Sequence, residues 1–344
     1  MEAVKVVAEG FNFICNLQFW RMSVLWTLSL VFSYFKVVLP WLPLPKIQCL
    51  LSSFTETLHF CQYGCDQTCL HNNWGSCIGM CSCVLPVNDL QATSGLGAAA
   101  AYALLEEVFM LFLVISDIKS QNQDACLKGF EVNLASFKSI LEFNQSLRQW
   151  LRDSNLHSSV QLLINNAGIL ATSRRLTSEG YDQMLATNYI GAFCVTKVLL
   201  PLLENSPVPS RVVNVTSFTH WNVCLLLFSY ELHRQINLTK KSHHLSVVAT
   251  DPGAVKTNIM REIPSCVSQM AFIVLKFLGL LQSSKTGVCS ILDAALAPPE
   301  VSGVYFFGGN GRSLNSSPLF YDANLAKELW ATSCNLFEEL QLAS

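Results

Sequence analysis

The sequence predicts an α/β fold, a doubly wound parallel sheet with an apolar N-terminal extension, and three observations favour this prediction. From about Val84 onward, short apolar runs alternate with helical patterns, as in βαβ units around a parallel sheet. A glycine turn at 92–97 opens an alanine-rich helical pattern, an arrangement that suits a phosphate site. Before residue 85 charged residues are scarce, while hydrophobic residues make up 51% of the chain. The composition can therefore supply a large core and an apolar extension.

The N-terminal extension is expected to associate with a membrane. Residues 22–35 carry no charge, and the apolar character resumes after Lys36. The segment reaches about 23 residues if the Lys36 ammonium group extends to the lipid headgroups. The alternative is a buried or interfacial helix, because the uncharged run alone is shorter than the roughly 20 residues that cross a bilayer.

The charge and the cysteines exclude two classes of partner. A net charge of −2 and a pI near 6.4 offer no basic face to nucleic acid. Six of the 14 cysteines lie at 61–83, but none of them has the C-x2-C spacing of a zinc site. We therefore expect no metal, and we interpret this stretch as a connector without assigned chemistry.

The chain divides into four expected regions: a membrane-associated segment at 1–48, a Cys-rich connector at 49–84, a nucleotide-binding α/β domain at 85–312 and a C-terminal helical extension at 313–344. Apolar runs predict strands at 108–115, 130–132, 160–164, 211–215, 245–250 and 303–307. Helical patterns predict helices at 97–107, 136–152, 178–203, 223–236 and 284–296. The strand before the glycine turn is weak, since Pro86 and Asp89 interrupt it.

The glycine turn is a candidate phosphate site. Its glycines let the backbone approach a pyrophosphate, and the free amides and the dipole of the following helix attract negative charge. A tight connection without a ligand is the alternative. The candidate residues are Thr93, Ser94, Gly95, Leu96 and Gly97.

Further motifs follow the glycine turn in a fixed order. They are Asn-Asn-Ala-Gly at 165–168, Asn188 in ATNYIGAF, Ser217 at the end of VNVTS, and DPGAVKT at 251–257. Together with the turn, they resemble the short-chain dehydrogenase/reductase family over roughly 85–310, and most of all its branch of retinol dehydrogenases and WW-domain oxidoreductases. The resemblance implies a Rossmann-type sheet with NAD or NADP bound across the carboxyl ends of its strands.

The resemblance also implies roles for individual residues. Ser217 would orient the substrate's carbonyl or alcohol group, and Asn188 would complete a water relay. The implied cofactor contacts beyond the glycine turn are Asp117, Asn133, Leu134, Asn165, Ala167, Gly168, Pro252, Gly253, Val255 and Thr257. Asp117 could select NAD by binding a ribose hydroxyl or could cap a helix. Structural alternatives exist for the others as well, because strand-end serines, helix-surface asparagines and Pro-Gly turns are common.

The catalytic Tyr-x-x-x-Lys of the family has no clear counterpart. Tyr230 lies 13 residues after Ser217, as in the family, and Arg234 follows it by one helical turn, so the two could form a phenol–cation pair. Yet Tyr230 lies only 22 residues before Pro252, where the family has about 30. The second interpretation is that Tyr230 and Arg234 are helix-surface residues, and that the catalytic segment is missing between Trp221 and Cys224.

We therefore expect hydride transfer between the nicotinamide and a small lipophilic alcohol or carbonyl compound, with activity that is impaired in this chain. A second departure is Gln91, which stands where the family's loop has glycine and would crowd the phosphate. The alternatives are an inactive nucleotide- or protein-binding module and a truncated product of a working gene. We expect a membrane-associated protein with a cytosol-facing domain, and the resemblance allows a homodimer. Residues 262–281 predict either an apolar lid or a membrane-facing helix.

Overall fold

The computed structural model describes residues 82–84, 110–111, 128–154, 156–171, 173, 175–217, 221–239, 244–260, 262–277, 279–307 and 322–343. The expected membrane segment, most of the Cys-rich connector, the glycine turn at 93–97 and Asp117 lie outside the described residues. The chain divides into two compact units, Met1–Gly75 with Pro264–Val267, and Ser76–Ile263 with Ser268–Ser344. The second unit contains the sheet.

The described strands form one parallel sheet in the order β2-β1-β3-β4-β5-β6. They are β1 (Ser82–Val84), β2 (Met110–Leu111), β3 (Leu162–Asn165), β4 (Ser210–Val215), β5 (Leu245–Asp251) and β6 (Val304–Phe307). The chain runs from β1 out to β2 and then returns to the other side of β1 for β3. This reversal confirms the doubly wound prediction. Buried, β-branched-rich sequences such as those of β4 and β5 are what a strand covered on both faces requires.

Two strands differ from the expectation. β1 consists of three residues that the sequence placed in the connector, and it ends at Val84, two residues before Pro86. At 130–132, where a strand was predicted, only Glu131 makes a bridge. A turn follows, in which the carboxamide oxygen of Asn133 accepts a hydrogen bond from the amide of Ala135 at 3.0 Å.

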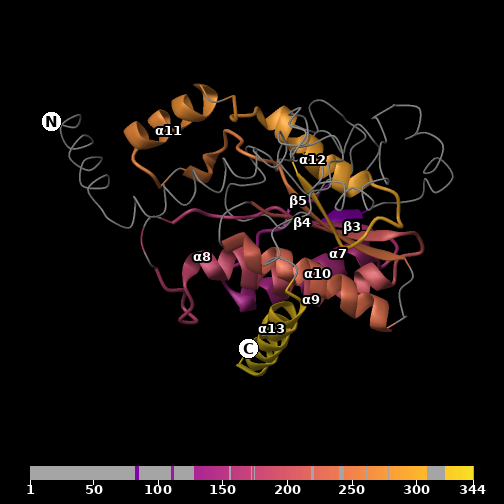
Figure 1. Ribbon diagram of the computed structural model, residues 1–344. Coiled ribbons are helices and arrows are strands. Elements are labelled where there is room, and N and C mark those ends of the chain that lie inside the picture. The colour runs from indigo at the N-terminus through magenta and orange to yellow at the C-terminus, as the bar shows by residue number, and fades with distance from the viewer. Residues whose placement is uncertain are drawn as a thin grey trace. The chain divides into compact units, whose positions relative to one another are not determined.

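Helices cover both faces of the sheet (Figure 1). One face carries α7 (Phe137–Asp153), α9 (Gly191–Glu204) and α10 (Trp221–Thr239), and the other carries α12 (Ser284–Leu296). The buried residues of α7 recur every three to four positions, as an amphipathic helix on a sheet requires: Phe137, Ile140, Phe143, Leu147 and Leu151. The helices predicted at 136–152, 223–236 and 284–296 are confirmed by α7, α10 and α12.

The helix predicted at 178–203 begins later and is not regular. It starts with α8 (Gln183–Leu185), where the carboxylate of Asp182 accepts hydrogen bonds from the amides of Met184 and Leu185. A π-helical turn at Ala186–Ile190 then leads into α9. Gly191 follows because a Cβ there would lie 2.5 Å from the carbonyl oxygen of Leu134. Periodicity alone shows neither the cap nor the π turn.

The segment Gln183–Glu204 is the one described helical stretch that is long and apolar enough to cross a membrane. Two thirds of its apolar window are buried within the protein. This burial identifies it as the core helix beside the sheet.

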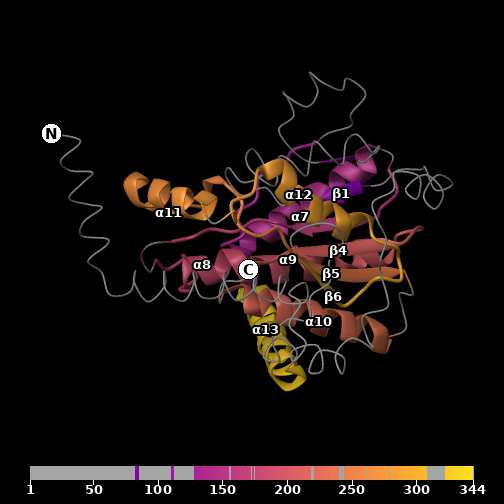
Figure 2. The same cartoon turned by 45° about the horizontal axis from the view of Figure 1, so that its top comes forward.

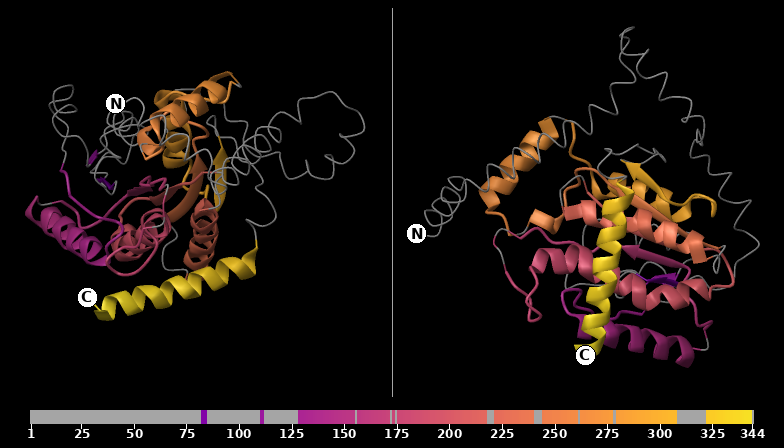
Figure 3. Two further views of the ribbon diagram at one scale, coloured as in Figure 1. Left: turned by 90° about the vertical axis from the view of Figure 1, so that its left-hand side faces the viewer. Right: turned by 60° about the horizontal axis from the view of Figure 1, so that its bottom comes forward.

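Helix α13 (Ala323–Ala343) crosses the outer side of this helical layer, as Figure 3 shows. Its Trp330 ring stacks on Phe228 of α10 at 6.0 Å, and its Phe337 ring lies 6.4 Å from Phe193 of α9. The Ser333 and Tyr189 hydroxyl groups form a hydrogen bond of 2.7 Å. The C-terminal helix thus completes the core on the side of α9 and α10.

Candidate active site

The candidate site is the edge at which the parallel strands end. β3 ends at Asn165, which pairs with Asn214 near the end of β4. Val215, the last residue of β4, pairs with Thr250, one residue before the end of β5. Ligands of doubly wound sheets bind at this edge. The register therefore brings the segments after β3, β4 and β5 to one place, and these segments contain most of the described candidate residues.

A buried chain of polar side chains fixes the strand ends. The Asn165 carboxamide donates hydrogen bonds to Asn214 Oδ1 at 2.7 Å and to Thr196 Oγ1 at 3.0 Å. Asn214 in turn donates to Ser229 Oγ of α10 at 2.8 Å, and Ser229 donates to the Leu225 carbonyl. Asn214 is fully buried, so each of these bonds compensates for a group removed from water. Asn165 therefore ties β3 to β4, α9 and α10.

Asn188 holds the segment that follows β3. Its carboxamide oxygen accepts a hydrogen bond from the Ile169 amide at 2.8 Å, and its nitrogen donates to the Ile169 carbonyl at 2.9 Å. Asn188 lies in the π-helical turn, and a Cβ on Gly168 would lie 3.6 Å from its oxygen. The structure thus brings Asn188 and Gly168 together. The alternative in which Asn188 is a solvent-facing polar group does not hold.

Ser217 lies just beyond β4. Its neighbour Thr216 is buried and donates from its backbone amide to the Thr250 carbonyl at 2.7 Å and from its hydroxyl to the same oxygen at 3.2 Å. Ser217 is half-buried at this rigid point. It is therefore positioned at the same edge as Pro252, which follows β5.

The loop after β5 is held by two residues that the sequence reasoning missed as site residues. Asp251 is fully buried, and its carboxylate accepts a hydrogen bond from the Gly253 amide at 2.7 Å. Its other oxygen accepts a hydrogen bond from the Tyr305 hydroxyl of β6 at 3.0 Å. Gly253 has φ of 76°, a conformation that favours glycine. An acidic residue before Pro-Gly at the end of an apolar strand was the available signal, since a buried carboxylate requires partners.

Burial and the neighbouring Asp251 carboxylate raise the pKa of Tyr305 well above its usual value. The Tyr230 phenol also contributes to this rise, so the two phenols lie in one neighbourhood. Tyr305 therefore stays protonated and acts as a hydrogen-bond donor to Asp251 at any physiological pH.

The rest of this loop is bound to the chain near α12. Val255 forms a parallel bridge with Gln282, whose amide donates to the Ala254 carbonyl at 2.8 Å. Thr257 is half-buried, and its hydroxyl accepts a weak hydrogen bond of 3.5 Å from the Ile259 amide at the start of the 3-10 helix η3 (Asn258–Met260). Pro252, Gly253, Val255 and Thr257 thus form one restrained loop beside Ser217.

Asn133 and Leu134 lie apart from that loop. Asn133 is exposed and forms the local turn described above, and its own amide donates to Ser139 Oγ at 2.9 Å. Leu134 is buried against Gly191 at the start of α9. Their backbones are held in place, as contacts to an adenine ring would require.

Arg234, one helical turn after Tyr230, binds the carboxylate of Glu231 on the same helix. Arg234 donates to both carboxylate oxygens of Glu231, at 2.8 Å from Nε and at 2.5 Å from Nη2. Burial alone would raise the pKa of Glu231, but the hydrogen bonds from Arg234 and Gln235 lower it below its usual value. Arg234 therefore serves Glu231, a buried carboxylate on its own helix, in this structure.

Tyr230 lies on α10 close to the strand ends, because its phenol is in the neighbourhood of Tyr305, whose hydroxyl is bonded to Asp251. The adjacent Ser229 lies beside Asn214, and one turn later the His233 ring packs on Gly303, which precedes β6. Since α10 begins at Trp221, Tyr230 is about 13 Å further along the helix axis. The first turn of α10, just after Ser217, contains neither tyrosine nor lysine.

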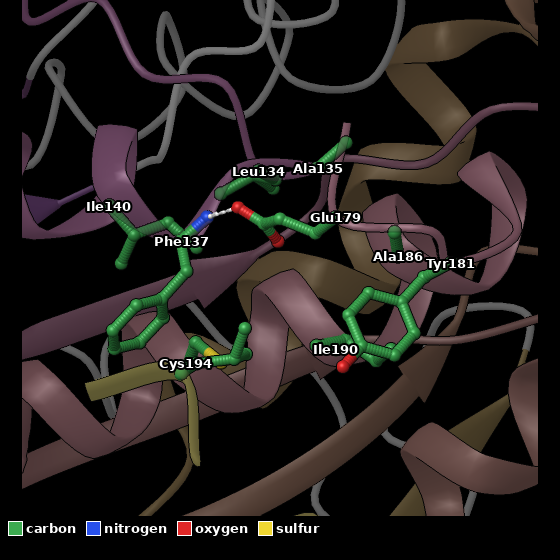
Figure 4. Close-up of a pocket in the computed structure, with 10 residues that line it drawn as sticks. Leu134, Ala135, Phe137, Ile140, Glu179, Tyr181, Ala186, Ile190 and Cys194 are labelled. Carbon is green, nitrogen blue, oxygen red and sulfur yellow. Dashed lines mark hydrogen bonds between the residues drawn. The ribbon is translucent and has the colours of Figure 1, made fainter. Parts of the chain in front are cut away.

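A small hollow lies elsewhere, at the N-terminus of α7 (Figure 4). In it, the Glu179 carboxylate accepts a hydrogen bond from the Phe137 amide at 2.9 Å. Burial, with a contribution from the Glu179 charge, raises the pKa of the Cys194 thiol to about 12, so this cysteine is no nucleophile. Of the candidate site residues only Leu134 lines the hollow.

The described residues fit a nicotinamide dinucleotide at the strand edge. The amide oxygen of Asn165 is buried and has no hydrogen-bond partner among the described residues, although the side chain is fixed by its nitrogen. The segment at 166–168 and the loop at 252–257 provide two restrained backbones beyond β3 and β5, the strands on either side of β4. Together they define a dinucleotide-binding α/β protein.

Comparison with known proteins identifies the family to which this dinucleotide-binding protein belongs. The short chain dehydrogenase family model matches residues 91–267, and the chain belongs to the short-chain dehydrogenase/reductase family. A nicotinamide dinucleotide, NAD or NADP, is the cofactor of this family. The chain is 28% identical over 252 residues to the polyprenol dehydrogenase of Homo sapiens, covering 65% of this chain and 73% of that protein. The identity to retinol dehydrogenase 13 of Homo sapiens is 26% over 249 residues, covering 64% and 71%.

Solved structures show the same fold. A short-chain type dehydrogenase/reductase from Mycobacterium marinum superposes with a TM-score of 0.54 at 12% identity, covering 68% of this chain and 95% of that one. A 3-oxoacyl-acyl-carrier-protein reductase from Brucella melitensis, in complex with NAD, gives a TM-score of 0.52 at 16% identity and covers 67% and 96%.

Proposed function

We propose that the chain is an NAD(P)-dependent oxidoreductase of a lipophilic alcohol or carbonyl compound whose hydride transfer is impaired. The observation that carries the proposal is the contrast within the site. The strand ends are fixed by buried hydrogen bonds, whereas Arg234, the cation one turn after Tyr230, is bonded to Glu231. The hydrogen-bonded strand ends support cofactor binding, and the bond between Arg234 and Glu231 supports weak catalysis.

The cofactor would be held by two groups of described residues. Asn133 and Leu134, with Ala167 and Gly168, would contact the adenosine half, and the loop of Pro252, Gly253, Val255 and Thr257 would contact the nicotinamide half. The glycine turn at 93–97 would hold the pyrophosphate, and Asp117 would favour NAD. When bound, the cofactor supplies the hydride acceptor or donor.

Ser217 would orient the substrate oxygen by a hydrogen bond from its hydroxyl group. A proton must also leave or reach that oxygen, and an efficient phenol needs a nearby free cation to lower its pKa. The guanidinium of Arg234, one helical turn after Tyr230, binds Glu231, so its positive charge is shared with that carboxylate. We propose that a segment with the Tyr-x-x-x-Lys is missing between Trp221 and Cys224, which would explain this arrangement.

A lipophilic substrate is supported by the relatives, which are named for polyprenol and retinol. We also propose that the N-terminal segment associates with a membrane, with the dehydrogenase domain on its cytosolic side, and that the protein can form a homodimer. The second candidate function is a nucleotide- or protein-binding module without turnover, which the Arg234–Glu231 pair favours.

Cofactor binding is tested by thermal unfolding of the full chain with NADH or NADPH. We expect the unfolding temperature to rise with cofactor concentration, because ligands that bind only the folded state stabilise it. A matched control is the same titration with AMP, which lacks the nicotinamide half and should give a smaller rise. Identical unfolding temperatures with and without millimolar cofactor would refute the oxidoreductase and the nucleotide-binding module.

Turnover is tested separately, by the change in NADH absorbance with retinal and with a polyprenal. We expect a rate well below that of the human polyprenol dehydrogenase assayed alongside. A rate equal to that enzyme's would refute the impairment. If residual turnover persists unchanged in Tyr230→Phe, Tyr230 is not the proton donor. A transcript that adds a Tyr-x-x-x-Lys after Trp221 would instead establish a truncated product.

A further inference from the structure

Helix α11 (Ser265–Phe277) has a large apolar stripe on its solvent side. Four residues at helical spacing make up this stripe: Met270, Ile273, Val274 and Phe277. They are between 52% and 90% exposed, whereas Leu275, on the opposite side of the helix, is 4% exposed. The helix is thus apolar on both sides, and only one of them is covered.

Such a stripe indicates a partner. A helix that is apolar all round is normally buried, and contiguous exposed apolar patches mark interaction sites. Burying one large apolar side chain contributes about 1.5–3 kcal/mol, so the four together offer several kcal/mol. α9 and α10 belong to the core of the domain (Figure 2), whereas the stripe residues of α11 are exposed.

The charges around the stripe indicate the kind of partner. Lys276 lies in the last turn of α11 and is exposed, and α11 contains no acidic residue. Lys256 is also exposed, and its Nζ lies 5.9 Å from the Phe272 ring of α11. The nearby carboxylate of Glu262 is paired with Arg175. An apolar stripe beside exposed lysines, on a helix without acidic residues, is typical of a helix that lies in an anionic membrane surface.

We propose that α11 docks on a lipid bilayer with anionic headgroups, with the stripe inserted at the boundary of headgroups and acyl chains and with Lys256 and Lys276 beside lipid phosphates. A second copy of the chain is a poorer occupant. Specific interfaces bury roughly 800 Å² on each partner, more than one face of a helix about 20 Å long supplies. The docking is independent of hydride transfer.

The position of α11 gives this docking a consequence for the site. The restrained loop at 252–257 leads through η3 into α11. A helix embedded in the membrane surface would therefore hold the nicotinamide side of the site next to the lipid phase, where a lipophilic alcohol is dissolved.

Photocrosslinking of the full chain tests the proposal even if the N-terminal segment also binds membrane. Benzoylphenylalanine is incorporated in place of Phe277, and in a matched control in place of Leu342 on α13, which is equally exposed at 90%. Both proteins are mixed with vesicles of phosphatidylcholine and phosphatidylserine, floated and irradiated. We expect lipid adducts at position 277 in several-fold excess over position 342.

Charge variants complete the test. Lys276→Glu and Lys256→Glu together should lower the adduct yield at position 277 several-fold on phosphatidylserine vesicles and change it little on pure phosphatidylcholine. Adducts to a second copy would show a dimer interface, and adducts within the chain would show a lid over the site. Either result overturns the proposal, as does equal or absent lipid labelling at positions 277 and 342 in chains that float with the vesicles.

Discussion

The strand ends and helix α10 meet at the same edge of the sheet, but they differ in what they offer to a reaction. At the strand ends, side chains from β3, β4, β5 and β6 are bonded to one another and hold two backbones where a dinucleotide would lie. Helix α10 contributes Ser229 to this framework, yet its cation is bonded to a carboxylate on the same helix. Cofactor binding in this fold thus depends on the hydrogen-bonded strand ends, whereas proton transfer depends on side chains of α10. One can be lost while the other is kept.

The largest effect is expected where α10 joins the strand ends. Asn214→Ala removes the acceptor for Asn165 and the donor for Ser229 inside the core, and should lower the free energy of unfolding by about 3 kcal/mol. Urea denaturation measures the change. Ser229→Ala, which removes only the outer hydrogen bond of the chain, serves as the milder comparison. Equal stability of Asn214→Ala and the unaltered protein would show that the network does not hold the edge together.

A smaller effect is expected at the nicotinamide loop. Tyr305→Phe leaves the ring in place but removes its hydrogen bond to Asp251, so the loop should loosen. We expect a loss of about 1 kcal/mol of binding free energy, which raises the dissociation constant for NADH roughly fivefold. Fluorescence titration measures this constant.

Tyr181→Phe is the matched control for that experiment. Tyr181 lines the hollow beside α7 and is absent from the loop, so its substitution should leave NADH binding unchanged. If both variants bind NADH equally well, the Tyr305–Asp251 bond does not position the loop.

A third effect concerns the far end of α10 and depends on pH. The His233 ring packs on Gly303 and forms a hydrogen bond of 2.7 Å with Ser302, and burial lowers its pKa below the usual 6.5. The folded state thus binds the proton less readily than the unfolded state. The contribution of neutral His233 to the free energy of unfolding should be fully present above pH 6.5 and should decline as the pH falls below 6.5. Urea midpoints between neutral and mildly acid pH should show this slope.

His233→Gln tests the assignment of that slope. Glutamine does not titrate, so the variant should have a flatter pH profile below 6.5. A profile as steep as that of the unaltered chain would assign the slope to other groups.

The smallest effect is expected from the pair that first suggests catalysis. Tyr230→Phe and Arg234→Lys should each leave the dissociation constant of NADH within about twofold, since neither residue is expected to touch the cofactor. Titration of each variant beside Tyr305→Phe makes the comparison direct. A large loss in either variant would place α10 inside the binding frame and remove the distinction between the two regions.

The sequence predicted the parts of this fold that depend on local pattern. The buried runs that became β4 and β5 and the periodic helix α7 were identifiable from alternation and spacing, and the order of motifs identified the family. Neither the π turn at Ala186–Ile190 nor the tertiary contact between Leu134 and Gly191, which follows that turn, was identifiable, because periodicity reports only local structure. The role of Tyr305 was hidden for the same reason. Its partner Asp251 is 54 residues away in the chain.

The candidate site shows the same limit. Asn188 and Ser217 were placed at the edge by motif order alone, but the partner of Arg234 could not be chosen from the sequence. Glu231 at three residues and Tyr230 at four are both within reach on a helix. Only the structure shows that the carboxylate is the partner.

The strand register described above also has a consequence for the time course of folding. β4 and β5 pair Asn214 with Ala249, 35 positions on, whereas β1 and β3 pair Cys83 with Leu162, 79 positions on. Closing the longer loop costs about 0.7 kcal/mol more in chain entropy, and pairings between distant segments form late. We expect β4 and β5 to pair before β1 joins β3. The edge that carries Ser217 and Asp251 would then exist before the strand that leads to the glycine turn is in place.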